Sequence, residues 1–336
     1  MTSPTPIPEP ALSAVAVLRR RKFVLAAGAA VLPGVAGAQA RPFTIVVPFP
    51  AGGGTALIAR SVARHLGFRL AAPVIIDNRA GAGGLIGASA LLQAPPDGQT
   101  LFLGSNSIFT VNPALRSSLP YDPASSFTGL AVLGTSPLAI LVKANAPWRS
   151  LRDAVAAAKS RPGEFAYGSF GPGSVAHFAG ELFKNQAAVN LLHVPYKGSA
   201  PAMQGLLGGQ VALAFDTIAA ALPQLRGGTI RCLAVTSENR VSSLPDVPTV
   251  AEAAVPGFHF DTWVAVVTRR DVAPEPLSRL RRALQEALST PELARELEQL
   301  GLVVRGANTL RFDDLVAAEV PRYRAIAARA GIKVDQ

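Results

Sequence analysis

The chain has 336 residues, of which 49% are hydrophobic and 16% are charged. That much apolar material excludes an intrinsically disordered chain, and a single cysteine excludes both a disulfide scaffold and a zinc site built on cysteines. At roughly 150 residues per domain, the length predicts two domains. The net charge of +10 would suit a nucleic-acid partner if the basic residues were clustered, but they are dispersed among acids, as Arg281 and Arg282 are near Glu286. We therefore expect no nucleic-acid partner.

Residues 1–40 have the order of a secretory signal. A basic cluster, Arg19-Arg20-Arg21-Lys22, precedes an apolar stretch, and Ala38-Gln39-Ala40 supplies the small residues of a cleavage site. Pro33 interrupts the stretch, which is shorter than the ~20 residues of a spanning helix, so an uncleaved membrane anchor is the weaker alternative. The arginines resemble a twin-arginine motif, but ordinary secretion signals also carry arginines, and both export routes stay open. We expect cleavage after Ala40, leaving 296 residues with a net charge of +7, because the leader removes four basic residues and one acid.

Short apolar runs alternate with helical patterns along the rest of the chain. β-Branched and apolar runs predict strands, and helical spacing or a capping box such as Ser150-Leu151-Arg152-Asp153 predicts the helices between them. We expect a mainly helical tail, preceded by strands at 44–49, 74–76, 100–104, 165–168, 191–194, 211–215 and 230–236 and by helices at 56–66, 84–92, 150–159 and 175–184. Strands that alternate with helices predict parallel sheets.

Two long apolar runs, at 130–142 and 263–268, predict strands that cross between two domains. A chain that crosses twice builds one domain from discontinuous segments and the other from the middle. We predict one lobe from residues 41–141 plus 264–336 and a second lobe from residues 142–263.

Two glycine-rich loops lead from a predicted strand into a predicted helix, at residues 48–55 and 169–174. Glycines let the backbone approach a ligand and expose N–H groups, and a helix start adds a partial positive charge, so each loop predicts an anion site. A tight turn without any ligand is the alternative for either loop. A dinucleotide site is disfavoured, because Leu57 and Ile86 occupy the third glycine position of the two possible fingerprints.

Signatures of catalysis are thin in the sequence. It contains neither G-x-S-x-G nor H-E-x-x-H, and its four histidines are scattered along the chain. We expect no catalytic residues, no metal and no cofactor. His177, Lys197 and Asp216 follow strands or loops where a ligand could lie, although a cap, a solvated lysine and a structural carboxylate are the alternatives.

Ordered motifs along nearly the whole mature chain resemble one family. Ile45–Thr55 reads IVVPFPAGGGT and His193–Ala202 reads HVPYKGSAPA, and further matches lie at 77–84, 94–101, 119–123, 180–184, 233–237 and 244–250. Together they resemble the substrate-binding receptors of the tripartite tricarboxylate transporters, the Bug-type periplasmic proteins.

The resemblance implies an α/β, two-lobed periplasmic binding protein of type II, a Venus flytrap in which each lobe is a mostly parallel sheet flanked by helices and two strands form the hinge. It also implies a small organic acid ligand, held mainly by backbone groups of the two loops, with Phe49 against its carbon skeleton. The expected ligand-binding residues are Phe49, Pro50, Ala51, Gly52, Gly53, Gly54, Thr55, Ser105, Asn106, Ser107, Ser169, Gly171, Gly173, Ser174, His177, Lys197 and Asp216. The family usually has an aspartate at the position of Ala56, and its absence predicts a carboxylate without an ammonium group.

The partners follow from the same resemblance. We expect a monomer in the periplasm that captures the acid for the membrane subunits of an uptake system. A receptor that feeds a membrane sensor kinase is the alternative, and an α/β enzyme using the same cleft is a more remote one.

Overall fold

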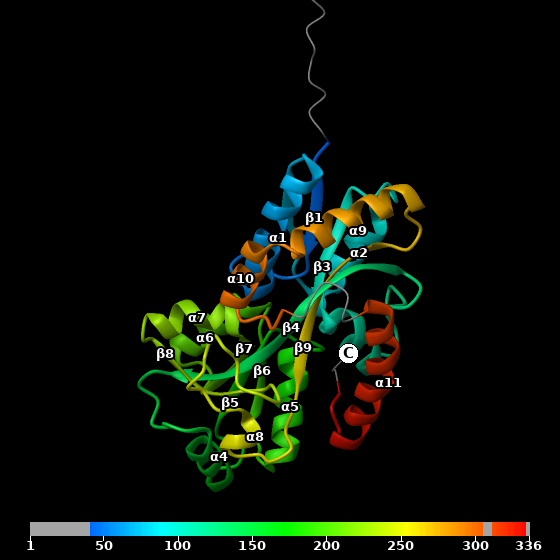
Figure 1. Cartoon of the computed structure of the whole chain (residues 1–336). Coiled ribbons are helices and arrows are strands. Elements are labelled where there is room, and N and C mark those ends of the chain that lie inside the picture. The colour runs from blue at the N-terminus through cyan, green and yellow to red at the C-terminus, as the bar shows by residue number, and fades with distance from the viewer. Residues whose placement is uncertain (1–40, 305–310, 334–336) are drawn as a thin grey trace, which may run out of the picture. The chain divides into compact units, whose positions relative to one another are not determined.

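The computed structural model describes residues 41–304 and 311–333 (Figure 1), and the expected signal segment lies outside them. None of the helices in this part of the chain has the length and apolarity that a membrane crossing needs. In chain order the elements are β1 (Phe43–Val47), α1 (Gly54–Leu70), β2 (Val74–Asn78), the 3₁₀ turn Ala82–Gly84, α2 (Leu85–Gln93), β3 (Thr100–Ser105), the wide turn Ser107–Val111, α3 (Asn112–Leu115), β4 (Phe127–Lys143), α4 (Leu151–Ser160), β5 (Ala166–Ser169), α5 (Val175–Ala187), β6 (Leu192–Pro195), α6 (Ser199–Gly208), β7 (Leu213–Thr217), α7 (Ile218–Arg226), β8 (Ile230–Val235), α8 (Val250–Ala253), β9 (Asp261–Arg269), α9 (Pro274–Leu288), α10 (Pro291–Gln299) and α11 (Phe312–Ala330).

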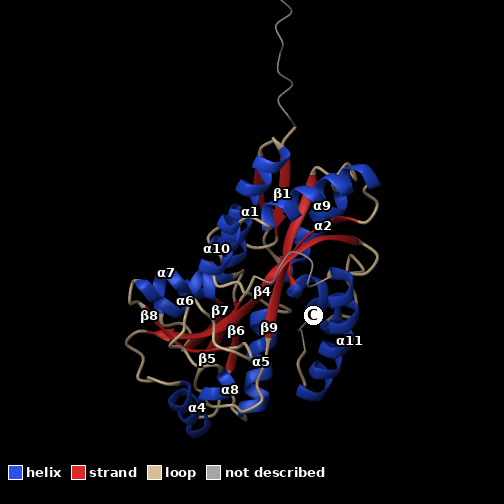
Figure 2. Ribbon diagram, in the orientation of Figure 1, coloured by secondary structure: helices blue, strands red, loops and turns tan. Residues whose placement is uncertain are grey.

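The strands form two mostly parallel groups that share β4. In the first group, lobe 1, the order is β2-β1-β3-β9-β4, and β9 alone runs antiparallel to its neighbours. In the second group, lobe 2, the order is β6-β5-β7-β4-β8, and here β4 is the antiparallel strand. Each lobe therefore contains four parallel strands and one antiparallel strand, which is β9 in lobe 1 and β4 in lobe 2. Helices flank the strands (Figure 2). This confirms the expected two-lobed α/β fold.

The chain crosses between the lobes at β4 and just before β9. Residues Phe127–Pro137 of β4 pair with β9, whereas Leu138–Lys143 pair with β7 and β8. Figure 1 shows β4 running beside β9 and on into the second group of strands. Thr236 ties both crossings together, since its N–H donates to Leu138 O at 2.9 Å and its carbonyl accepts from Phe260 N at 2.9 Å. The lobe boundaries expected from the sequence stay a prediction.

Both faces of the central strands β1, β3, β7 and β9 are buried, which explains their continuous apolar runs. On β1, Ile45 and Val47 pack with α1 and α9 on one face, while Val46 belongs to a cluster on the other face. That second cluster continues through both lobes, because Phe178 of α5 contacts Tyr323 of α11 with ring centroids 5.1 Å apart. The two lobes thus share part of one apolar core.

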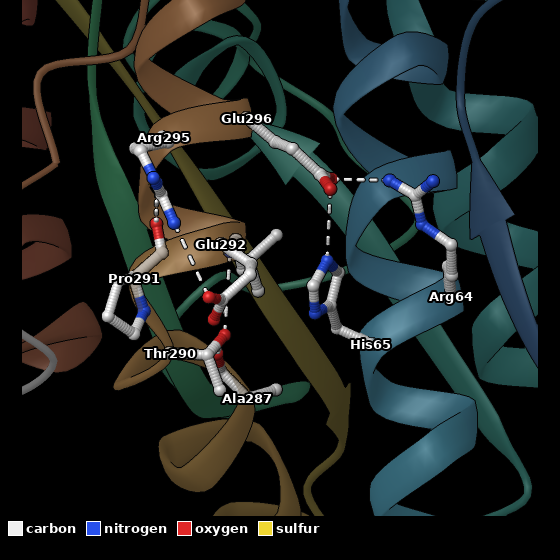
Figure 3. Close-up of polar contacts among 9 residues, drawn as sticks. Arg64, His65, Ala287, Thr290, Pro291, Glu292, Arg295 and Glu296 are labelled. Carbon is white, nitrogen blue, oxygen red and sulfur yellow. Dashed lines mark hydrogen bonds and ion pairs between the residues drawn. The ribbon is translucent and has the colours of Figure 1, made fainter.

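One carboxylate links α10 to α1, beside their shared apolar packing. Glu296 accepts from Arg64 Nη2 at 2.5 Å and lies 3.2 Å from His65 Nε2, as Figure 3 shows. The Thr290 hydroxyl caps the start of this helix, since it accepts from Leu293 N at 3.4 Å. These contacts fasten the C-terminal part of lobe 1 to the helix that leads from the first glycine loop.

Candidate functional site

The first glycine loop, residues 48–53 and here called loop 1, links β1 to α1. Its backbone is fixed near its start, because Asn78 Nδ2 donates to Phe49 O at 2.8 Å. Gly53 is the N-cap of α1 and has no side chain to cap it. Among the described residues, the Gly54 and Thr55 N–H groups donate no hydrogen bond. The start of α1 therefore offers two unpaired donors and the positive end of a 17-residue helix.

Loop 1 lies against the starts of two lobe 2 helices. A Cβ on Gly198, which precedes α6, would lie 2.6 Å from Pro50 Cδ, and a Cβ on Gly53 would lie 3.4 Å from Ser199 Cβ. A Cβ on Gly54 would clash with Thr217 Oγ1 at the start of α7. Three helix N-termini, those of α1, α6 and α7, consequently meet at this contact.

Asp216 lies beneath this meeting point and is fully buried. Its Oδ1 accepts from Ser199 Oγ at 2.7 Å and from Thr217 N at 2.7 Å, which orients the first residues of α6 and α7. Its Oδ2 has no partner among the described residues. Burial raises the pKa of Asp216 to about 7, although the hydrogen bonds from Ser199 and Thr217 lower it. The carboxyl group is therefore largely protonated below neutral pH.

The second glycine loop, Ser169–Ser174 and here called loop 2, already uses most of its backbone donors. Gly171 N donates to Ser169 Oγ at 3.2 Å, and Gly173 N donates to His177 Nδ1 at 3.3 Å. The Ser174 hydroxyl caps α5 by accepting from His177 N at 3.2 Å. Of the two glycine loops, loop 1 thus leads into the helix start whose backbone N–H groups are unpaired.

The turn after β3 reaches across to loop 2. Ser107 Oγ accepts from Val175 N, the first N–H of α5, at 2.9 Å, and Ser105 Oγ accepts from Ser107 N at 3.4 Å. Asn106 points elsewhere, because its amide donates toward Asp261 O at 3.5 Å and Tyr323 OH at 3.4 Å. Within this turn, Ser107 therefore contacts lobe 2, while Asn106 contacts β9 and α11.

One histidine lies beside a serine in this region. Ser169 Oγ is 2.6 Å from His193 Nε2, and the His193 ring stacks on His177 with centroids 4.3 Å apart. Burial lowers the pKa of His193 to about 4, and the neighbouring His177 adds to the shift. A neutral, weakly basic imidazole behind a fully buried serine supports the loop 2 backbone, because Ser169 also accepts from Gly171 N.

The structure brings several of the predicted site residues to contacts between the lobes. Loop 1 meets lobe 2 near Asp216, and Ser107 meets loop 2 at Val175. Ala51, Gly52 and Lys197 lie exposed, while the imidazole of His177 packs behind loop 2. Among the described residues no group of three or more His, Cys, Asp or Glu could hold a metal ion.

Sequence reasoning missed Ser199 and Thr217, which lie at the contact of loop 1 with lobe 2, and it placed Phe170 in the second glycine loop without assigning its side chain a role. Gly198-Ser199 followed by Pro201 is a helix-start pattern, and Thr217 caps α7 by accepting from Ala220 N at 3.3 Å. Nothing in the sequence around Phe170 indicates that its ring packs on Phe49, because an isolated aromatic residue in a loop does not identify its contact partner.

Comparisons with known proteins agree with the motifs. The sequence profile of the "Tripartite tricarboxylate transporter family receptor" matches residues 58–332. Protein BugT of Bordetella pertussis is 35% identical over 313 residues, covering 93% of this chain and 96% of BugT.

Two solved structures are similar over most of the chain. One is an R. palustris protein solved with adipate, with a TM-score of 0.82 at 35% identity, covering 88% of this chain and 98% of that one. The other is MatC from Rhodopseudomonas palustris with bound malate, with a TM-score of 0.80 at 31% identity, covering 85% and 99%. The family profile and the relatives together establish that the chain belongs to the receptor family of the tripartite tricarboxylate transporters, with Bug-type relatives.

Proposed function

We propose that this protein is an extracytoplasmic receptor that binds a small carboxylate without an ammonium group, between loop 1 and the starts of α6 and α7. The observation that carries the proposal is the meeting of three helix N-termini at Gly53 and Gly54, with the Gly54 and Thr55 N–H groups unpaired among the described residues. Relatives solved with adipate and with malate support a carboxylate as the ligand.

The binding energy would come from helix ends rather than from cationic side chains. Each helix start behaves as roughly half a positive charge, and its N–H groups point toward the anion. Helices α1, α6 and α7 have 17, 10 and 9 residues, so each is long enough to contribute. An anion at these helix starts would accept hydrogen bonds from backbone N–H groups that otherwise need water as their acceptor.

Asp216 bears on the kind of acid that fits. An ionised carboxylate would repel an anionic ligand, but with a pKa near 7 the buried group carries a proton below neutral pH. A protonated Oδ2 is a donor to an anion rather than a partner for an ammonium group. Ala56, buried in the first turn of α1, adds no carboxylate there. Both features favour succinate-like over aspartate-like ligands.

Ligand capture would move the lobes about the crossings. We infer that residues 41–141 plus 264–336 and residues 142–263 move as units, since the pairing of β4 changes between Pro137 and Leu138. A ligand that contacts both lobes stabilises the arrangement in which they meet. The receptor would then deliver the acid, in the periplasm and as a monomer, to the membrane subunits of the transporter.

A thermal-shift screen of the purified protein tests the proposal. Malate, succinate, adipate and citrate are compared with aspartate and with a nucleotide. A ligand at 1,000 times its Kd should add about 4.1 kcal/mol of stability, which is a clear rise in Tm. The absence of a shift with any acid, or a larger shift with aspartate than with succinate, would contradict the proposed ligand class. Uptake of a labelled acid that depends on both receptor and membrane subunits tests the transport role.

A further inference from the structure

Two phenylalanine rings join the glycine loops. The rings of Phe49 in loop 1 and Phe170 in loop 2 pack edge to face, with centroids 6.2 Å apart and an interplanar angle of 66°. They are 8% and 6% exposed. Phe49 follows β1 of lobe 1 and Phe170 follows β5 of lobe 2, so the pair is an apolar bridge between the lobes.

The backbone around each ring is held in place. Phe49 O accepts from Asn78 Nδ2 at 2.8 Å. On either side of Phe170, Ser169 O accepts from Tyr196 N at 3.0 Å and Gly171 N donates to Ser169 Oγ at 3.2 Å. The backbone at both rings is therefore held within its own lobe, and the position of the lobes sets the distance between the two loops.

The pair leaves no room for a third ring between its members. An aromatic ligand stacked between two rings needs both at a van der Waals spacing of about 3.5–4 Å, which puts the outer centroids at least about 7 Å apart and the planes parallel. Here the centroids are closer than that, and the planes are inclined by 66°. Parting the lobes to admit such a ring would also stretch the Ser107 Oγ–Val175 N hydrogen bond of 2.9 Å.

We propose that Phe170 determines ligand size: with Phe49 it forms a wall that restricts the site to short aliphatic carboxylates and excludes aromatic acids. This inference rests on the proposed carboxylate-binding function. It assigns the selectivity to Phe170, whose ring packs on the ring of Phe49 in loop 1, whereas affinity for the carboxylate itself comes from the start of α1.

Isothermal titration of the full chain with succinate, adipate, benzoate and phenylacetate tests the assignment. The wild type should prefer succinate or adipate. Phe170→Ala should shift the ratio of benzoate to succinate affinity toward benzoate by about tenfold or more, as expected when a ring fills a cavity of its own size. Phe170→Leu keeps apolar bulk and should shift the ratio less. Phe165→Ala is the matched control, because it removes a lobe 2 ring that packs on Trp148 at 4.9 Å, away from loop 1.

The outcomes separate the inference from the function beneath it. If the wild type binds benzoate as tightly as succinate, or if Phe170→Ala leaves the ratio unchanged while still binding acids, Phe170 is not the selecting residue and the receptor function stands. If the wild type binds none of these acids, the proposed function itself fails. Unfolding curves without ligand show whether each variant is folded. If Phe170→Ala is unfolded, the affinity ratio of Phe170→Leu is compared with that of the wild type instead.

Discussion

The Ser107 hydroxyl, which follows β3 in lobe 1, accepts a hydrogen bond of 2.9 Å from the N–H of Val175, the first residue of α5 in lobe 2. The bond satisfies a helix N-terminal donor with a group from the other lobe. It can form only while the lobes meet, so it links the position of loop 2 to that of β3.

Ser107→Ala should therefore weaken ligand binding without unfolding the protein. A net loss of about 1 kcal/mol from one hydrogen bond corresponds to roughly fivefold weaker binding. Isothermal titration with the tightest acid measures it. Ser160→Ala on α4, whose hydroxyl donates to Ala157 O within its own helix, should leave the Kd unchanged. Wild-type affinity in Ser107→Ala would mean that this bond does not contribute to holding the lobes together.

Gly54→Ala should remove ligand binding while the fold is kept. The added Cβ would clash with Thr217 Oγ1, so the lobes could not approach each other fully. Alanine in the first turn of a helix does not itself destabilise α1. We expect at least about a tenfold loss of affinity, since 1.4 kcal/mol of lost interlobe contact suffices for that.

Gly53→Ala is the matched control for this substitution. Its Cβ would lie 3.4 Å from Ser199 Cβ, an ordinary contact, and Gly53 has a φ of −75° that alanine adopts readily. Titration of both variants with the same acid compares them. Equal affinities would show that the approach of Gly54 to Thr217 is not required for binding.

Asp216→Asn should change how stability depends on pH. The pKa of an unfolded aspartate is about 3.9, and burial raises the folded value to about 7. Between these values the folded state binds more protons, so the free energy of unfolding falls as the pH rises, by up to about 1.4 kcal/mol per pH unit. Asparagine keeps an acceptor for Ser199 and Thr217 but has no proton to lose.

Urea unfolding at pH 5 and at pH 8 measures this difference. The asparagine variant should gain stability relative to the wild type as the pH rises from 5 to 8. Only in the wild type does unfolding release a proton from this site, and a higher pH favours that release. Parallel pH profiles for the two proteins would show that Asp216 does not titrate in this window.

Glu296→Gln should loosen α10 from α1. The carboxylate lies between Arg64 and His65 and is partly buried (Figure 3), so its loss should cost about 0.5–1 kcal/mol at low salt and less at high salt. Glu292→Gln is the control, because Glu292 is exposed and pairs with Arg295 of its own helix at 3.3 Å. Chemical unfolding compares the two, and equal losses would mean that the contact with α1 adds nothing.

The strands and helices of the fold can be predicted from the sequence because the patterns that indicate them involve neighbouring residues. Buried parallel strands appear as continuous apolar runs, and the Ser150 and Thr290 caps mark helix starts that the structure retains. The sequence does not mark the start of α6 at Ser199 as part of the site, and the φ of +117° at Gly198 before it appears only in the structure. Its importance comes from meeting Pro50, and nothing in either segment indicates that the two meet.

The sequence by itself determined the two α/β lobes, the two crossings, both glycine loops and the family, because strand and helix periods, caps and ordered motifs are properties of neighbouring residues. Only the tertiary structure decided which groups face loop 1. It brought the starts of α6 and α7 to Gly53 and Gly54, buried Asp216 between Ser199 and Thr217, and set the ring of Phe170 against Phe49. The contacts of Gly53, Gly54 and Phe49 depend on how the two lobes dock across β4, whereas those of Asp216 with Ser199 and Thr217 form within lobe 2. Docking joins residues more than a hundred positions apart, and the local sequence around each of them holds no information about so distant a partner.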